Sequence, residues 1–415
     1  IEYPGAINIH TPEEIRDNLA REVIDPLIRA LTVEESGESE SAPPPLRPPR
    51  ETVFEGNLEE VNRFFLEKGW TDGHAIIPPT PEKIARFLEY TDLPPDGEIA
   101  VLPQAKLRAT PRNIAANAVM AGCRPEHLPV LIAAVEAVAD PLFDLMQLGT
   151  TGAIHPFLLL NGPIVKEMGF NHGVGAISHP PNVAVARAFG LILRNIAGFK
   201  PGEMWMGTFG YFPPFLIAED EAGSPWETYH TGHGFRREDS TVTAAATMNW
   251  GPQVFLSSPD AEAMLKLVAL GLYKTVIPHA FLFGPRAMAM VLITPPTAKA
   301  LADAGYPKKR AEEWLQKNTT MPPGEAAFLL ANSTERHETV ASLIQKGVLP
   351  ASIDPDKEIP VMTGREGMVE IVVCGDPARS KVQPLWTCYQ NPVTRRIKLP
   401  RNRDKLLRNE KNKAL

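Results

Sequence analysis

Three side chains able to bind a metal ion or move a proton stand within seven residues, in the segment PWETYHTGHGF. They are Glu227, His230 and His233. Carboxylate and imidazole groups are common ligands of zinc and iron, so one hypothesis is a divalent-metal site formed by all three. Residues at i, i+3 and i+6 spread around a helix, however, and the segment has no His-Glu-x-x-His spacing. We therefore favour a role for His230 as an acid/base group or as a donor to a substrate, and the cofactor stays unknown.

A second candidate proton acceptor is Asp72, in the segment WTDG that follows an expected helix. A carboxylate on a tight turn can accept a proton or bind the ammonium group of a substrate. The alternative is that Asp72 caps its own turn or the next helix. His230 and Asp72 together form the predicted acid/base pair.

The run HPFLLLNGP predicts a buried strand, and polar residues follow it. Asn161 ends the run, and Asn171 and His172 precede a glycine-rich connector. Open α/β sheets bind ligands at the carboxyl ends of their strands. We therefore predict that Asn161 and Asn171 position a substrate and that His172 joins the catalytic residues. Ahead of the same strand, Thr150 and Thr151 precede a glycine, a pattern that can hold an anion through backbone N–H groups.

Further candidates lie on an alanine-rich expected helix, RNIAANAVMAGC. Asn117 shares one helix face with Asn113, and Cys123 follows the helix end. Two amides and a thiol on a small apolar surface can line a substrate pocket. The alternatives are that Asn113 caps the helix and that Cys123 is a buried, unreactive thiol, because no neighbouring base is evident from the sequence.

The elements that would position these residues alternate between strand and helix. Short apolar runs such as STVTAAATMNW and MVEIVVCGDP are separated by longer amphipathic stretches. This alternation predicts an α/β fold, in which a helical N-terminal region packs on a mixed or largely parallel sheet with flanking helices. No repeat of fixed short period is evident.

Five segments are expected along the chain. They are a docking helix at 1–33, a linker rich in proline, serine and glutamate at 34–50, a mostly helical region at 51–145, an α/β region with the site at 146–393, and a basic tail at 394–415. Thr11, Thr80 and Thr110 each precede a proline, which predicts a helix start at each position.

Composition narrows the class of protein. The 415 residues carry a formal net charge of −7 and three cysteines without a Cys-x-x-Cys pair, which argues against a disulfide framework. Residues 394–415 hold nine basic and two acidic residues, without interleaved aromatics. We expect an arm lying on an acidic neighbouring subunit rather than a nucleic-acid contact. No apolar run reaches the length of a membrane-spanning helix and no signal-peptide pattern opens the chain, so we predict a cytoplasmic, non-membrane protein.

Five blocks of sequence carry a resemblance to a known family. They are GWTDGHAIIPPTPEKI (69–84), NIAANAVMAGCRPEHLPVLIAAVEAV (113–138), TTGAIHPFLLLNGPI (150–164), LRNIAGFKPGEM (193–204) and SPWETYHTGHGF (224–235). In this combination the chain resembles the UGSC-associated bacterial family of (seleno)proteins, whose members are often labelled thioredoxin-like. Longer relatives carry a Sec/Cys-Gly-Ser-Cys segment, which these 415 residues lack. The resemblance therefore implies a thiol or selenol that is lost or is supplied by another chain.

The resemblance also bears on individual residues. It includes Trp226, Glu227 and His230, which adds Trp226 to the predicted substrate-binding residues, whereas His233 is particular to this chain. Where the family reads Gly-Pro-Glu-His-Ala, this chain has the residues of 284–288, GPRAM, so no role is carried over there.

These observations predict an enzyme acting on a small polar molecule by acid/base chemistry. A lyase or hydrolase is favoured over a redox enzyme, because neither a dinucleotide-binding motif nor a cysteine pair is present. The first alternative is a subunit of a hetero-oligomeric redox enzyme whose partner supplies the UGSC thiol or selenol. The second is a metal-dependent enzyme centred on Glu227, His230 and His233. A packing helix on a long linker favours docking on another subunit, so we expect a homo-oligomer, with a second kind of subunit under the first alternative.

Overall fold

The computed structural model describes most of the chain. The described residues are 4, 11–32, 52–102, 105–210, 213–276, 288–333, 338–363, 365–387, 391–403 and 406. They belong to two compact units, one formed by Ile1–Val53 with Glu335–His337 and the other by the remainder. The predicted linker at 34–50 and the segment 284–287 lie outside the described residues.

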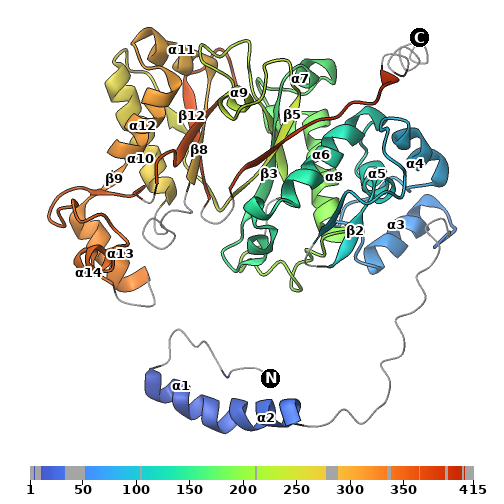
Figure 1. Ribbon diagram of the computed structural model, residues 1–415, viewed down its shortest axis with the longest axis horizontal. Coiled ribbons are helices and arrows are strands. Elements are labelled where there is room, and N and C mark those ends of the chain that lie inside the picture. Colours follow the sequence, from blue (N-terminus) through green and yellow to red (C-terminus); the bar gives the residue numbers. More distant parts are fainter. Residues whose placement is uncertain are drawn as a thin grey trace. The chain divides into compact units, whose positions relative to one another are not determined.

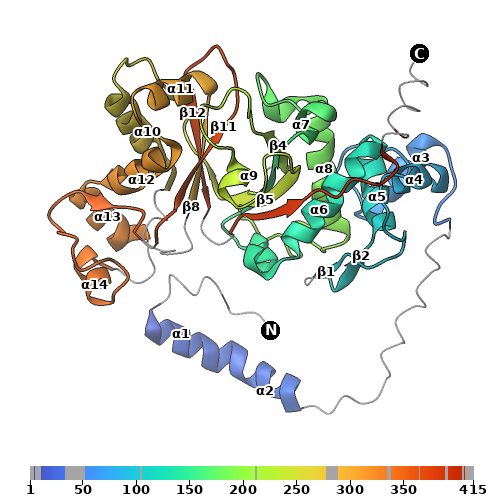
Figure 2. The ribbon, with the colours of Figure 1, turned by 45° about the horizontal axis from the view of Figure 1, so that its top comes forward.

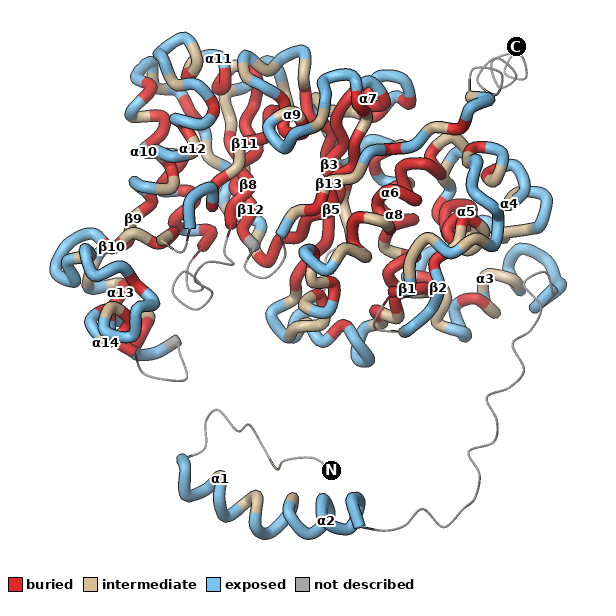
Figure 3. The backbone as a smooth tube through the Cα atoms, in the orientation of Figure 1, coloured by how far each residue is buried: buried red, intermediate tan, exposed pale blue. Residues whose placement is uncertain are grey.

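The first unit contains one continuous helical segment. It consists of α1 (Pro12–Asn18), a π-helical turn (Leu19–Val23) and α2 (Ile24–Thr32). Its predicted start is confirmed: the Thr11 hydroxyl accepts the N–H of Glu14, and the Glu14 carboxylate accepts the N–H of Thr11. None of the described residues of this segment is buried (Figure 3).

The second unit contains two sheets that pack face to face. The first has strand order β13-β5-β3-β4, formed by Val393–Arg396, Thr241–Thr247, His155–Asn161 and Phe215–Ala218. The second has order β11-β8-β12-β6, formed by Val369–Val373, Met288–Ile293, Lys381–Thr387 and Asn249–Trp250, and β7 (Val254–Phe255) also pairs with β12. Phe157 and Leu159 of β3 share one buried cluster with Met290 and Leu292 of β8. An apolar core therefore fills the space between the sheets.

Helices cover the outer face of each sheet (Figures 1 and 2). The first sheet is covered by α6 (Leu128–Val138) and α8 (Pro180–Asn195), the second by α10 (Ala261–Val276) and α12 (Lys308–Asn318). The result is a four-layer α/β/β/α arrangement, which confirms the predicted α/β fold with mixed sheets and flanking helices. The residue pattern did not indicate two facing sheets, because strands buried on both faces are apolar throughout.

The two sheets repeat one topology. In each, a first strand pairs in parallel with a second and antiparallel with a third: β3 with β4 and β5, and β8 with β11 and β12. The registers match as well, since the pairs Leu160–Ala218 and Leu160–Val242 correspond to Ile293–Val373 and Ile293–Val382. One residue beyond these pairs, toward the carboxyl ends of the strands, Asn161 of the first repeat corresponds to Thr294 of the second. In the same way, Glu219 corresponds to Cys374. The chain therefore contains two structural repeats that its sequence pattern did not indicate.

One edge strand of each sheet belongs, in chain order, with the strands of the other sheet. β6 follows β5 directly but joins the second sheet beside β12, and β13 follows β12 but joins the first sheet beside β5. The two repeats are therefore interlocked, and they do not form separate domains.

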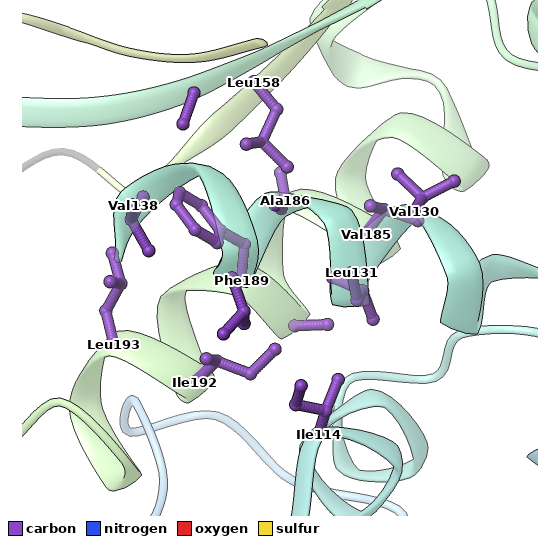
Figure 4. Packing of buried hydrophobic residues seen from close by; sticks show 14 of the residues in the cluster. Ile114, Val130, Leu131, Val138, Leu158, Val185, Ala186, Phe189, Ile192 and Leu193 are labelled. Carbon is purple, nitrogen blue, oxygen red and sulfur yellow. The ribbon is translucent and has the colours of Figure 1, made fainter. Parts of the chain in front are cut away.

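The region predicted as mostly helical packs against the first sheet. It contains α3 (Leu58–Glu67), α4 (Pro81–Leu88), α5 (Pro111–Met120) and α6, with a short hairpin of β1 (Ala100–Leu102) and β2 (Leu107–Ala109). The predicted starts at Thr80 and Thr110 are confirmed as N-caps. Figure 4 shows the core that joins these helices, where Ile114 and Leu131 pack with Phe189 of α8.

The remaining elements are short or connect the strands. They are α7 (Ile164–Glu167), α9 (Tyr229–Gly232), α11 (Pro295–Asp303), α13 (Pro323–Ser333), α14 (Val340–Gln345), β9 (Thr320–Met321) and β10 (Ile359–Pro360). Within the part of the chain that the structure describes, no helix combines the length and apolar character needed to cross a membrane.

The segment predicted as a basic tail begins inside the first sheet. Residues 394–396 belong to β13, and the flanking Val393 and Ile397 are buried. Each basic residue described after position 393 forms an ion pair: Arg395 with Asp140, Arg396 with Asp239, Lys398 with Glu136, Arg401 with Asp92, and Arg403 with Glu167. The acidic surface under this arm therefore belongs to the same chain. A strand of the fold replaces the expected tail over its first residues.

Candidate functional site

Polar side chains gather where β3 and β4 end. We call them the strand-end cluster: Asn161, His172, Glu219, Asp220, Glu221, His230 and Thr241. A cavity of about 580 Å³ opens beside them, and its lining includes His172 and all three acidic residues. β3 and β4 are parallel neighbours, so their carboxyl ends meet at one edge of the sheet, where α/β proteins commonly bind ligands.

Three members of the cluster form a row across the edge of the sheet. Asn161 pairs with Thr241 of β5, and Glu219 lies beside it, one residue beyond the last paired position of β4. All three are buried on the face that looks toward the second sheet. Among the described residues, no hydrogen-bond partner reaches Thr241 Oγ1, Asn161 Oδ1 or Glu219 Oε1. Buried oxygens without partners are costly, which marks this row as a place built to bind a polar group.

Glu219 is the most deeply buried carboxyl group of the cluster, with 1% of its surface exposed. Its Oε2 accepts the backbone N–H of Tyr229 at 2.7 Å and an N–H from Asn161. Burial raises the pKa of Glu219, and neighbouring Glu221 adds to this, while Lys308 and the two hydrogen bonds oppose it. The two donors occupy Oε2, so the proton of the neutral acid belongs on Oε1, the oxygen without a partner.

His172 and Asp220 form a second pair on the wall of the cavity. Nδ1 of His172 is buried and lies 3.5 Å from Oδ1 of Asp220, whereas 43% of the side chain is exposed. Asp220 is held in place, because Oδ1 accepts the N–H of Gly223 at 2.9 Å and its own N–H donates to Val373 at 2.7 Å. A carboxylate behind one ring nitrogen can orient a histidine and leave the other nitrogen toward the cavity.

His230 lies behind the cavity and not in it. It is fully buried, and its Nδ1 lies 3.0 Å from the Thr228 hydroxyl and 3.6 Å from Oε1 of Glu221. Burial lowers the pKa of His230, although Glu221 and the nearby backbone carbonyls of residues 236 and 237 favour the protonated ring. Glu221 in turn accepts the N–H of Gly162 at 2.6 Å. His230 therefore lies behind Glu221 and is not among the described residues that line the cavity.

The turn after β3 requires glycine at position 162. Gly162 has a φ of +87°, and a side chain there would collide with the backbone of Asp239 and Ser240. This turn brings the Gly162 N–H to Glu221 and lets Asn161 end the strand inside the cluster. The Asn-Gly pair seen in the sequence therefore shapes the site.

The other predicted substrate-binding residues lie outside the row. Asn171 lines the cavity, but its amide closes its own turn by bonding to Gly173 and Val174. Thr150 and Thr151 precede the first residue of β3 and so lie at the opposite end of that strand from Asn161. The Thr151 carbonyl accepts the N–H of Thr208, so this segment is joined to a neighbouring loop.

Asn117, Cys123 and Trp226 have structural partners. Asn117 accepts a hydrogen bond from Asn195 at 2.7 Å, and the Cys123 thiol donates to the Ala184 carbonyl at 3.3 Å. Burial raises the pKa of Cys123, so its thiol is inert, as the second interpretation had it. The Trp226 indole donates to the Tyr306 carbonyl at 3.0 Å and packs on the core of the second repeat.

Asp72 does not share the site of His230. Its two oxygens accept hydrogen bonds from Arg187 of α8, both at 2.9 Å, so it joins the helical region to the first sheet's outer layer. Burial would raise the pKa of Asp72, but Arg187 and the N–H of His74 outweigh it and lower the pKa below the ordinary 3.8. The predicted acid/base pair is therefore not assembled, because the two residues serve different parts of the fold.

Replacing Asp72 with asparagine is expected to lower the unfolding free energy by about 1 kcal/mol at pH 7 and to leave turnover unchanged. The difference from wild type should vanish as the pH falls through the lowered pKa of Asp72, because protonation removes the same ion pair. Denaturant titrations at pH 7 and about pH 3 measure this. Lost turnover with unchanged stability would restore Asp72 to a catalytic role.

The three residues of the suggested metal site face different partners. Nε2 of His233 lies 3.1 Å from Glu370, His230 faces Glu221, and the exposed Glu227 contributes its backbone carbonyl to Lys308. Across the described ranges, no group of three or more His, Cys, Asp or Glu side chains is placed to hold a metal ion. The hypothesis of a triad fails here because α9 is a short helix that turns successive side chains to different sides.

Sequence reasoning missed Glu219, Asp220, Glu221 and Thr241. A usable signal was present, since three acidic residues follow directly after the apolar run FLIA, at the end of a strand. Thr241 carries no such signal, because threonine is common in strands and only the register places it beside Asn161.

Comparison with known proteins does not assign the chain to a family. No family model matches the chain, and no curated protein sequence matches it. The resemblance to the UGSC-associated family therefore stays a prediction.

Proposed function

We propose that the protein is an enzyme that acts on a small polar molecule by acid/base chemistry at the strand-end cluster, as a hydrolase or lyase. The observation that supports this most is the pairing of a carboxylate-backed histidine, His172, with a buried carboxylic acid, Glu219, on one cavity. A histidine and a carboxylic acid on one cavity can serve as base and acid in the same reaction.

Each group has a defined task in this proposal. His172 takes a proton from the substrate or from an attacking water, and Asp220 stabilises the imidazolium that results. Glu219 donates its Oε1 proton to the group that leaves. In the row, Asn161 lies between Glu219 and Thr241, and the free oxygens of Asn161 and Thr241 are offered to donors on the substrate. The cavity of about 580 Å³ suits a small molecule.

The test is a screen of small esters, amides and hydroxy acids, followed by paired histidine variants on any substrate that is turned over. His172→Ala is expected to lower kcat by about 10²- to 10³-fold. His179→Ala is the matched control, because His179 lines the same cavity but is exposed and has no carboxylate partner among the described residues. Equal losses in the two variants, or full turnover in His172→Ala, would refute the proposal.

Assembly and location stay predictions. We infer a homo-oligomer, because within its own unit the helical segment at 12–32 leaves apolar side chains such as Ile28 and Leu31 exposed; the cytoplasmic location stays a prediction. A hydrophobic helix face of this kind is commonly covered by another subunit. Native mass spectrometry of the full chain tests the oligomeric state.

A further inference from the structure

A second polar cavity, of about 770 Å³, lies against α12, apart from the strand-end cluster. We call it the α12 pocket. Its inner wall is formed by Lys308 and Glu312 of α12, Tyr229 and His233 of the α9 segment, and Glu370 of β11. Neither the acid/base proposal nor any sequence motif uses Lys308, Glu312 or Glu370.

Lys308 is the unusual residue of the α12 pocket. Only 8% of its surface is exposed, which is rare for lysine. Its Nζ makes one long hydrogen bond, 3.4 Å, to the carbonyl of Glu227 and lies 5.9 Å from the centre of the Tyr229 ring. Within the described ranges, no carboxylate approaches it to 4.0 Å, the limit for an ion pair. A buried ammonium group without a counter-charge is costly, so it favours an anion in the pocket.

Glu312 stands one helical turn from Lys308, on the same face of α12. A lysine and a glutamate four residues apart commonly form an ion pair, but these two are held apart. Oε1 of Glu312 instead accepts the N–H of Ile371 at 2.8 Å, while Lys308 turns to Glu227. Both side chains face the same cavity, and each keeps hydrogen-bonding capacity that no described residue uses.

Two neighbouring charged groups on the inner wall, Glu370 and His233, pair with each other. Glu370 accepts the phenol proton of Tyr229 at 2.8 Å and lies 3.1 Å from Nε2 of His233, whose pKa it raises. Glu370 and His233 form a pair with no net charge when His233 is protonated. Glu227 is exposed and also lines the pocket. Lys308 is therefore the buried charge of the inner wall that has no carboxylate within 4.0 Å among the described residues.

We propose that the α12 pocket binds a small carboxylate anion, one oxygen on the Lys308 ammonium and the other accepting a proton from Glu312. A carboxylate fits better than a phosphate, because two free donors match two oxygens and a single negative charge. Among the described residues, no arginine lines the pocket to hold a doubly charged group. The binding step forms two hydrogen bonds and breaks no covalent bond.

Protonation of Glu312 is coupled to this binding. Burial is the main reason that the pKa of Glu312 is raised to about 7; Glu370 and Glu227 raise it further, and Lys308 and the Ile371 N–H oppose them. Above this pH Glu312 becomes a carboxylate and repels the ligand. Affinity should therefore fall about tenfold from pH 6 to pH 8, with one proton taken up per ligand near pH 8.

The experiment is isothermal titration calorimetry of the full chain with acetate, lactate and succinate at pH 6 and pH 8, in buffers of different ionisation enthalpy. Lys308→Met should weaken binding at pH 6 by about tenfold or more. Glu312→Gln should keep binding at both pH values but abolish proton uptake and most of the pH dependence, because an amide donates without titrating. His172→Ala, in the other cavity, should bind as wild type does.

Several specific outcomes would contradict the proposal. Binding that is unaffected by Lys308→Met, or proton uptake that persists in Glu312→Gln, would overturn it. So would binding of inorganic phosphate in preference to all three carboxylates. If His172→Ala abolished binding while Lys308→Met did not, the carboxylate would belong to the strand-end cluster.

Discussion

Glu219→Gln is expected to lower turnover by about 10²- to 10⁴-fold while the protein stays folded. The glutamine carbonyl can still accept the N–H of Tyr229, at the place of the present 2.7 Å hydrogen bond, so the start of α9 is kept. What the amide lacks is the acidic proton on the oxygen that faces no partner. The loss should fall on kcat and leave KM nearly unchanged, since the variant retains the shape of the site.

The pH dependence separates a catalytic loss from a structural one. The pKa of Glu219 is raised, mainly by burial, so wild-type turnover should fall as the pH rises through that pKa. The residual activity of Glu219→Gln should lack this limb. The variant should lose turnover without losing stability. A raised carboxyl pKa destabilises the wild-type fold at high pH, so Glu219→Gln should be at least as stable as wild type at pH 8.

Two results would contradict this assignment. Full turnover in Glu219→Gln would remove Glu219 from the chemistry. A variant that unfolds at pH 8 would show that the carboxyl group serves the fold, and a thermal melt recorded beside the kinetics reveals this. Glu219→Ala is the less informative change, because it leaves donors on Tyr229 and Asn161 without an acceptor.

Ending the chain before Asn391 is expected to prevent folding of the whole second unit. The truncation removes β13, which pairs with β5 along Val393–Arg396. It exposes the core sites of Val393 and Ile397, leaves Asp140 without Arg395, and leaves Asp239 with Arg236 as its remaining arginine. Burial of the two apolar side chains alone contributes about 3–6 kcal/mol, a large part of a typical protein's stability.

The matched control ends the chain after Leu406 and keeps β13 and its ion pairs. We expect this shorter deletion to give a soluble protein with an unfolding transition close to that of the full chain, measured by circular dichroism. If both truncations fold equally well, β13 is not a required strand, and the basic segment is the dispensable tail that its composition suggested.

Local signals in the sequence predicted many of the elements correctly. Thr11, Thr80 and Thr110 cap helices where a threonine-proline pair indicated a start. These signals act over three or four residues, so neighbouring side chains suffice to produce them. The exchange of β6 and β13 between the sheets follows from pairing across more than a hundred residues, which no local pattern encodes.

The candidate site divides in the same way. Asn161 and His172 lie near each other in the strand-end cluster, as expected for residues that both follow a strand whose apolar run is evident; their role in one site stays a prediction. Asp72 was paired wrongly with His230, since a loop carboxylate looks the same in sequence whether it faces a substrate or an arginine such as Arg187. Glu312 and Lys308 gave no signal either, because an amphipathic helix rich in Lys and Glu usually presents them to water.

The sequence by itself determined the fold class, the helix starts and the strand after which polar residues collect. These depend on residue type and short-range spacing, which set backbone preference and the apolar face of each element. Only the tertiary structure decided which polar residues meet. Burial, pairing register and the contact between the two sheets bring Glu219 beside Asn161 and separate Asp72 from His230. They also bury Lys308 with no carboxylate within 4.0 Å among the described residues. A charged side chain acquires its chemistry from the groups that surround it, and those groups come from distant parts of the chain.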